Sequence, residues 1–117
     1  MDIDAFLDKL KIKLNIFGYE FSRERTENRE TMKELGISMH NVKDFLSELG
    51  KEDYSEGPKN DQEEGGEYWV FGKEINNKEV YIKLNLGKES RKVVCYSFHI
   101  AKSKMKLPNK EINKKTK

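Results

Sequence analysis

The stretch YWVFGKEINNKEVYIKLNL, residues 68–86, decides the fold. Its second half alternates apolar with polar side chains, as a half-buried strand does. The apolar set is Val80, Ile82, Leu84 and Leu86, and the polar set is Glu79, Tyr81, Lys83 and Asn85. Asn76-Asn77 separates this strand from another apolar run, and asparagine tolerates the left-handed backbone of a two-residue turn. The pattern predicts a hairpin whose pairs run from Ile75 and Lys78 to Tyr68 and Asn85, with Gly72 opposite Tyr81.

A third strand, KVVCYSFHI at residues 92–100, follows a short loop. Pairing Leu86 with Lys92 buries Val94, Tyr96 and Phe98, whereas a slip of one residue buries Val93, Cys95, Ser97 and His99 instead. We predict the first register because it buries more apolar surface. It places three side chains against the middle strand: Cys95 beside Lys83, Ser97 beside Tyr81, and His99 beside Glu79.

The segments before these strands have mostly helical patterns. Residues 3–14 place their apolar side chains on one stripe, residues 26–36 form a helix capped by Thr26 or Asn28, and Ser38 caps another helix that ends at Gly50. Residues 17–23 alternate as a short strand, and residues 51–66 are the least structured part. The predicted class is α+β, with N-terminal helices on one face of an antiparallel sheet and an open face opposite. We expect one domain at residues 1–108 and a basic C-terminal tail at 109–117.

The amino-acid composition indicates which class of protein the chain belongs to. Of the 117 residues, 38% are charged and 35% are hydrophobic, which suits a small soluble domain better than a disordered chain. The acidic, amphipathic start MDIDAFLDKL does not have the pattern of a signal or transit peptide, and no apolar run approaches the roughly 20 residues of a membrane span. The single cysteine, Cys95, predicts no internal disulfide and no zinc cluster. We therefore expect a cytoplasmic protein that needs no membrane, metal or other cofactor.

Charge is distributed unevenly along the chain. Residues 101–117 contain seven lysines and one glutamate, whereas residues 52–67 contain seven acidic residues and one lysine. The basic end is either a frayed, solubilising terminus or an arm that attracts phosphate groups, in which case its binding would weaken steeply with salt.

The predicted hairpins gather chemically useful side chains on the open face. These side chains are Glu74, Glu79, Tyr81, Lys83, Ser97 and His99. Gly72, opposite Tyr81, is consistent with room for a ligand over the strand. Each candidate also has an ordinary structural explanation: Tyr81 is a good strand former, Lys83 solvates a sheet face, and a lone histidine near a strand end is more often structural than catalytic.

Five sequence motifs, which follow one another in a characteristic order, resemble those of a known protein family. NRETMKELGIS, EDYSEGP, EYWVFGKEI, KEVYIKL and VVCYSFHIAKSKMKLP, spread from about Phe17 to Pro108, resemble the MqsR-family toxins of bacterial type II toxin–antitoxin systems. That family is similar in fold to the RelE-type ribonucleases. The resemblance implies a compact α+β toxin with a twisted, RelE-like antiparallel sheet. It also implies an enzyme that cuts mRNA, free or on the ribosome, without a metal, and that is held inactive by a cognate antitoxin.

The resemblance carries over to single residues only in part. Tyr81 matches a functional tyrosine of the family. His99 and Glu56 stand where the best-known member has lysines, and Val70 stands where it has a glutamine. Because these replacements change the chemistry, the family's mechanism cannot be copied residue by residue.

Metal-free RNA cleavage needs a base for the ribose 2′-hydroxyl, an acid for the leaving 5′-oxygen and a cation for the phosphate. We predict His99 as acid or base, Lys83 as the cation, and Tyr81 as the residue that orients the phosphate or stacks on a base. Glu79 would fix the tautomer of His99. Further RNA-binding or supporting candidates are Tyr54, Ser97, Arg23, Arg25, Lys102 and Lys104. The alternative is a non-catalytic protein- or RNA-binding module with a degenerated toxin site, and the replacement of lysine by His99 favours it.

Overall fold

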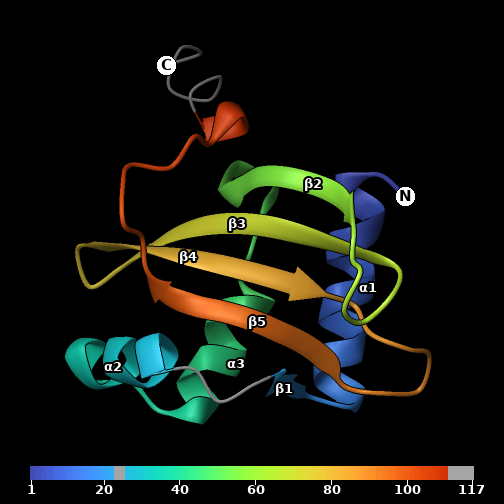
Figure 1. Cartoon of the computed structure of the whole chain (residues 1–117), viewed down its shortest axis with the longest axis horizontal. Coiled ribbons are helices and arrows are strands. Elements are labelled where there is room, and N and C mark those ends of the chain that lie inside the picture. The colour runs from blue at the N-terminus through green and yellow to red at the C-terminus, as the bar shows by residue number, and fades with distance from the viewer. Residues whose placement is uncertain (23–25, 111–117) are drawn as a thin grey trace.

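The predicted hairpin lies at the centre of a mixed sheet. The computed structural model describes residues 1–22 and 26–110, and in these residues five strands pair in the order β1-β5-β4-β3-β2 (Figure 1). The elements are α1 (Ile3–Ile16), β1 (Tyr19–Phe21), α2 (Thr26–Leu35), α3 (Met39–Ser47), a 3-10 turn η1 (Lys51–Asp53), β2 (Tyr54–Asn60), β3 (Glu67–Ile75), β4 (Lys78–Asn85) and β5 (Val93–Ile100). The α+β class, with helices against the sheet, is confirmed.

The turn between β3 and β4 sets the register of the whole hairpin. Asn76 and Asn77 adopt φ angles of 50° and 66°, the left-handed conformations that a two-residue turn needs. All predicted pairs form, from Ile75 opposite Lys78 to Tyr68 opposite Asn85. The side-chain amide of Asn76 also donates a hydrogen bond to the Leu35 carbonyl (3.0 Å), which fastens the turn to the end of α2.

The hydrophobic core lies between one sheet face and the helices α1 and α3 (Figure 1). Phe6, Leu10 and Leu14 point from α1 into this core, and the Phe6 ring stacks on Trp69 of β3 with centroids 4.7 Å apart. The predicted cap of α3 is confirmed: the Ser38 hydroxyl accepts a hydrogen bond from the Asn41 amide. Burial of the apolar stripes therefore selects which sheet face the helices cover.

The outer edge of β5 is closed in two ways. Along Val93–Cys95 it pairs in parallel with β1, which makes the sheet mixed instead of wholly antiparallel. Farther along, α2 lies against the edge and its polar side chains replace a neighbouring strand. Asn28 donates to the Tyr96 carbonyl and accepts from the Phe98 amide, and Thr31 accepts from the Ile100 amide. Asn28 is thus a buried bridge inside α2 and not the N-cap that its position suggested.

The segment 51–66 is more ordered than its composition predicts. It contains η1 and β2, and β2 pairs antiparallel with β3 through two irregularities that shift the register. After β2, the Asp61 carboxylate accepts hydrogen bonds from Asn85 of β4 (2.8 Å) and from the Tyr96 hydroxyl of β5 (2.5 Å). These long-range contacts fix the turn between β2 and β3 over the sheet.

The predicted register between β4 and β5 is wrong, by two residues from Ser97 to Ile100 and by one residue at Val94 and Cys95. His99 lies opposite Tyr81, Ser97 opposite Lys83 and Phe98 opposite Ile82. A bulge at Tyr96, between Cys95 and Ser97, reverses the faces, so that Cys95 enters the core and Tyr96 turns to the open face. The physical reason is the polar tip of Tyr96, which needs a partner when the ring is buried and finds Asp61 there.

Residues 101–110, the C-terminal segment, turn back and cross the open face (Figure 1). Met105 and Leu107 occupy the space above Gly72, where an added Cβ would lie 2.7 Å from the Met105 sulfur. The Met105 amide donates to Glu79, and the Ser55 hydroxyl donates to the Lys106 carbonyl. The room predicted over Gly72 is therefore filled by the protein itself, and this part of the basic end is held against the sheet. The rest of the predicted tail, residues 111–117, lies outside the described residues.

Candidate active-site cleft

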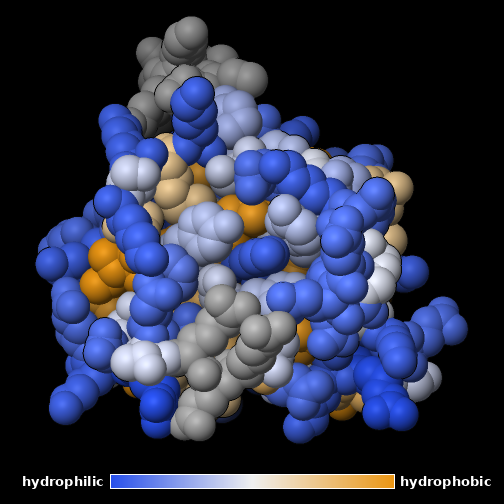
Figure 2. Space-filling model, viewed as in Figure 1, coloured by the Kyte–Doolittle hydropathy of each residue, from blue (hydrophilic) through white to orange (hydrophobic). Residues whose placement is uncertain are grey.

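A cleft of about 590 Å³ remains on the open face between the C-terminal segment, α2 and β2. Figure 2 views this face and shows mainly hydrophilic side chains on it. Residues of four strands, α2 and the C-terminal segment line the cleft: Glu27, Ser55, Glu56, Val70, Tyr81, His99, Ala101, Lys102, Ser103, Lys104, Met105 and Lys106. Val70 is buried in its floor.

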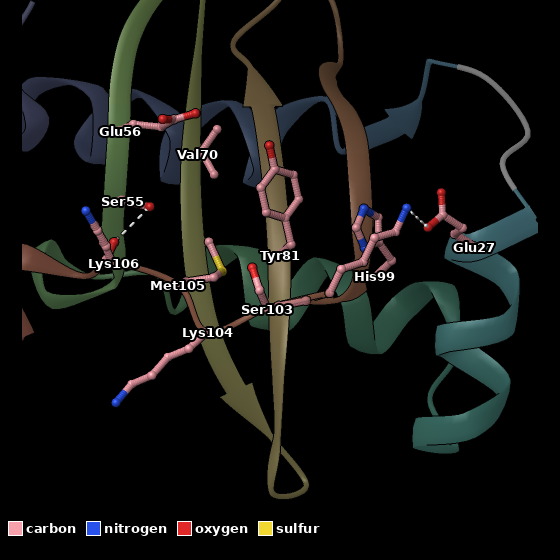
Figure 3. A pocket seen from close by; sticks show the side chains of 12 residues that line it. Glu27, Ser55, Glu56, Val70, Tyr81, His99, Ser103, Lys104, Met105 and Lys106 are labelled. Carbon is pink, nitrogen blue, oxygen red and sulfur yellow. Dashed lines mark hydrogen bonds and ion pairs between the residues drawn. The ribbon is translucent and has the colours of Figure 1, made fainter.

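The rings of Tyr81 and His99 form one wall of the cleft. Strand pairing places the two residues opposite each other, and their rings stack with centroids 5.2 Å apart and planes 16° apart (Figure 3). The His99 Nδ1 atom lies 3.0 Å from the Ile100 carbonyl oxygen. Because a carbonyl oxygen can only accept, Nδ1 carries the hydrogen and Nε2 is the nitrogen that can exchange a proton with a ligand. The prediction that Glu79 fixes this tautomer is wrong, since Glu79 binds the Met105 amide.

The hydroxyl of Tyr81 is a hydrogen-bond donor under physiological conditions. Burial, and after it the nearby Glu56 carboxylate, raises the pKa of Tyr81 above its ordinary value. The raised pKa keeps the phenol protonated, so it can donate to an anionic group such as a phosphate.

Glu56 forms the opposite wall, although it was not among the site residues predicted from the sequence. It pairs with Val70 across β2 and β3, and its carboxylate points over Val70 toward Tyr81 (Figure 3). Lys59 holds the carboxylate from the same strand, with 3.2 Å between the Lys59 Nζ and Glu56 Oε2 atoms. Residues 51–66 were expected to be a loop, and their side chains do not alternate between apolar and polar. The orientation of Glu56 could therefore not be predicted from the sequence.

Lysines supply positive charge at the cleft. Lys102, Lys104 and Lys106 come from the C-terminal segment and line it. The ammonium group of Lys102 pairs with the Glu27 carboxylate at 3.1 Å. Two of these lysines, Lys102 and Lys104, were among the predicted RNA-binding candidates, and the fold brings both to the cleft that holds Tyr81 and His99.

The remaining predicted residues lie elsewhere. Lys83 shares the open face but does not line the cleft: its ammonium group lies 4.2 Å from the centre of the Tyr68 ring and 5.0 Å from that of Tyr96. Ser97 is buried beside Lys83. Tyr54 lies on the helix-covered face, against Trp69 and Phe71. Two further candidates, Arg23 and Arg25, lie outside the described residues.

Two features of the described residues concern metal ions and membranes. Within residues 1–22 and 26–110, no three histidine, cysteine or acidic side chains gather where they could hold a metal ion. In the same residues, no helix combines the length and the apolar character needed to cross a bilayer.

Comparison with known proteins identifies the family. The sequence model of the family described as "Motility quorum-sensing regulator, toxin of MqsA" matches residues 6–100, well over half of the chain. No curated protein and no solved structure gives a significant match. The description of the family names MqsA as the partner of its toxin, and membership of the family implies an antitoxin partner. The chain belongs to the MqsR toxin family, and it is a toxin of a toxin–antitoxin system.

Proposed function

We propose that the protein is a metal-independent endoribonuclease that cleaves mRNA in the cytoplasm, and that the cleft is its active site. The observation that carries the proposal is the Tyr81–His99 stack in a cleft rimmed by lysines. Under this proposal the antitoxin keeps the enzyme inactive until it is released.

The residues of the cleft match the needs of RNA cleavage by the ribose 2′-hydroxyl. His99 transfers a proton through Nε2, because Nδ1 is engaged by the Ile100 carbonyl. The Tyr81 hydroxyl donates a hydrogen bond to the scissile phosphate and orients it. Lys102, Lys104 and Lys106 attract the RNA backbone, and Lys83 adds positive charge from the neighbouring part of the open face.

The test is cleavage of an mRNA transcript by the purified full-length protein in the presence of EDTA. We expect cleavage that leaves a 2′,3′-cyclic phosphate and a 5′-hydroxyl. His99→Gln should slow it by about 10²–10⁴-fold, the usual contribution of a proton-transfer residue. The matched control is His40→Gln, because His40 is an exposed side chain on α3 far from the cleft in the fold and should leave the rate unchanged.

Two outcomes would overturn the proposal. One is intact RNA after incubation with the wild-type protein, together with unimpaired growth of bacteria that express it without an antitoxin. RNA that is bound and not cut would then favour the non-catalytic module. The other is cleavage that His99→Gln and His40→Gln leave equally unaffected.

A further inference from the structure

The proposed nuclease needs two proton transfers, and His99 alone supplies one of them. The group that takes the 2′-hydroxyl proton and the group that protonates the 5′-oxygen must stand on opposite sides of the phosphate. Besides His99, the described residues that line the cleft include two carboxylates, Glu27 and Glu56. Glu27 is on α2, on the same side as His99, and pairs with Lys102.

Building on the proposed function, we infer that Glu56 is the general base of this site and His99 its general acid, with the scissile phosphate held between them over Val70 and Tyr81. Glu56 lies on β2 and His99 on β5, with one strand carrying Val70 and one carrying Tyr81 between them (Figure 3). Strands lie roughly 4.8 Å apart, so the two backbones are roughly 14 Å apart. The Glu56 carboxylate points over Val70 toward Tyr81, so a phosphodiester group bound there would have Glu56 on one side and the Tyr81–His99 stack on the other.

The surroundings of Glu56 suit a carboxylate that accepts a proton and then releases it. Lys59 faces it from its own strand and Tyr81 from β4. The Glu56 side chain is 45% exposed, so water and the substrate can reach it. The ion pair with Lys59 orients the carboxylate without burying it.

The reaction is balanced without any other reactant. Glu56 takes the proton from a ribose 2′-hydroxyl, and the 2′-oxygen forms a bond to phosphorus. The bond from phosphorus to the 5′-oxygen breaks, and His99 gives its Nε2 proton to that oxygen. The products are a 2′,3′-cyclic phosphate and a 5′-hydroxyl. Glu56 is left protonated and His99 neutral, and exchange with water restores both.

The decisive measurement is the pH dependence of the cleavage rate for the wild-type protein, Glu56→Gln and His99→Gln. A base and an acid together give a bell-shaped profile. Glu56→Gln should slow cleavage about 10²-fold or more at the wild-type optimum and remove the acidic limb, where the base becomes protonated. His99→Gln should instead remove the alkaline limb. Glu67→Gln is the matched control, because Glu67 is an exposed glutamate on the adjoining strand that does not line the cleft.

The outcomes separate this inference from the proposed function. If the wild-type protein cleaves RNA and Glu56→Gln keeps both the rate and the acidic limb, Glu56 is not the base, although the nuclease stands. A rate lowered equally at every pH, or a Lys59→Gln variant that reproduces the Glu56→Gln profile, would show that Glu56 only positions Lys59 and would also overturn the inference. If the wild-type protein cuts no RNA, the proposed function itself fails.

Discussion

Replacing Asn28 by alanine should destabilise the protein strongly although Asn28 does not line the cleft. This residue is 1% exposed, and it bonds two backbone groups of β5 that lack a strand neighbour at this edge. The bond from the Phe98 amide is 3.0 Å long and the bond to the Tyr96 carbonyl is 3.3 Å long. Alanine would leave both backbone groups buried without a partner.

The expected cost follows from these two bonds. A buried polar group left without a partner costs about 1–3 kcal/mol. Loss of the longer bond, to the Tyr96 carbonyl, should cost about 1 kcal/mol, the low end of that range. The higher helix propensity of alanine offsets about 0.5 kcal/mol of the total cost. We therefore expect the free energy of unfolding to fall by about 1.5–3.5 kcal/mol. With a urea slope of about 1–3 kcal/mol/M, the unfolding midpoint should fall by roughly 0.5–3.5 M.

The assay is urea unfolding followed by circular dichroism, with Glu30→Ala as the matched control. Glu30 is an exposed residue of α2, so its replacement changes helix propensity and removes no buried bond. A second variant, Asn28→Asp, keeps an acceptor for the Phe98 amide but sets a buried carboxylate against the Tyr96 carbonyl, so at neutral pH it should be destabilised at least as much as Asn28→Ala. The reasoning is refuted if Asn28→Ala and Glu30→Ala shift the midpoint equally.

Three further predictions concern charge and burial. Hydrogen bonds from Tyr96, Asn85 and two backbone amides outweigh burial and lower the pKa of Asp61 in the folded protein. Its ionised form therefore adds stability that is lost as the pH falls below about 4, and urea midpoints measured against pH should show a weaker acid dependence for Asp61→Asn. If Lys104 contacts an RNA phosphate, Lys104→Gln should reduce the slope of log affinity against log salt by about 0.7, whereas Lys11→Gln on the outer side of α1 should not. Cys95 is fully buried, so a thiol reagent should label it only at denaturant concentrations that unfold the chain.

The central hairpin could be predicted from sequence because its determinants are local. The Asn76-Asn77 turn fixes the register at one end, and each further pair follows from the alternation of side chains. The register of β5 could not be predicted in the same way. It depends on the bulge at Tyr96, and that bulge depends on Asp61, which is 35 residues earlier in the chain.

The same limit applies to the candidate site. Tyr81 was predicted on the open face from the alternation of β4, and His99 from the register that buries more apolar surface; the two-residue error in register at His99 preserved its face. Glu56 was not predicted as a site residue because β2 is an edge strand that contains glycine, proline and charged residues. The pairing of β2 with β3 is also irregular. The orientation of the Glu56 side chain depends on the pairing of β2 with β3 and on the two register shifts in that pairing. Neither can be predicted from residues 51–66 alone.

The position of the cleft is decided by what covers the rest of the open face. At one end, Met105 and Leu107 close the space over Gly72, and at the other, the Asp61 turn covers Tyr96 and Asn85. Between these two covers, the sheet exposes the stack of Tyr81 and His99, with Glu56 across from it. In MqsR-family terms, His99 and Glu56 are the two positions where lysines were expected, and they are the two walls of this cleft. Under the proposed mechanism, an acid and a base would stand on opposite sides of one space where the family resemblance implies two cations, which is the arrangement that proton transfer to and from a phosphodiester requires.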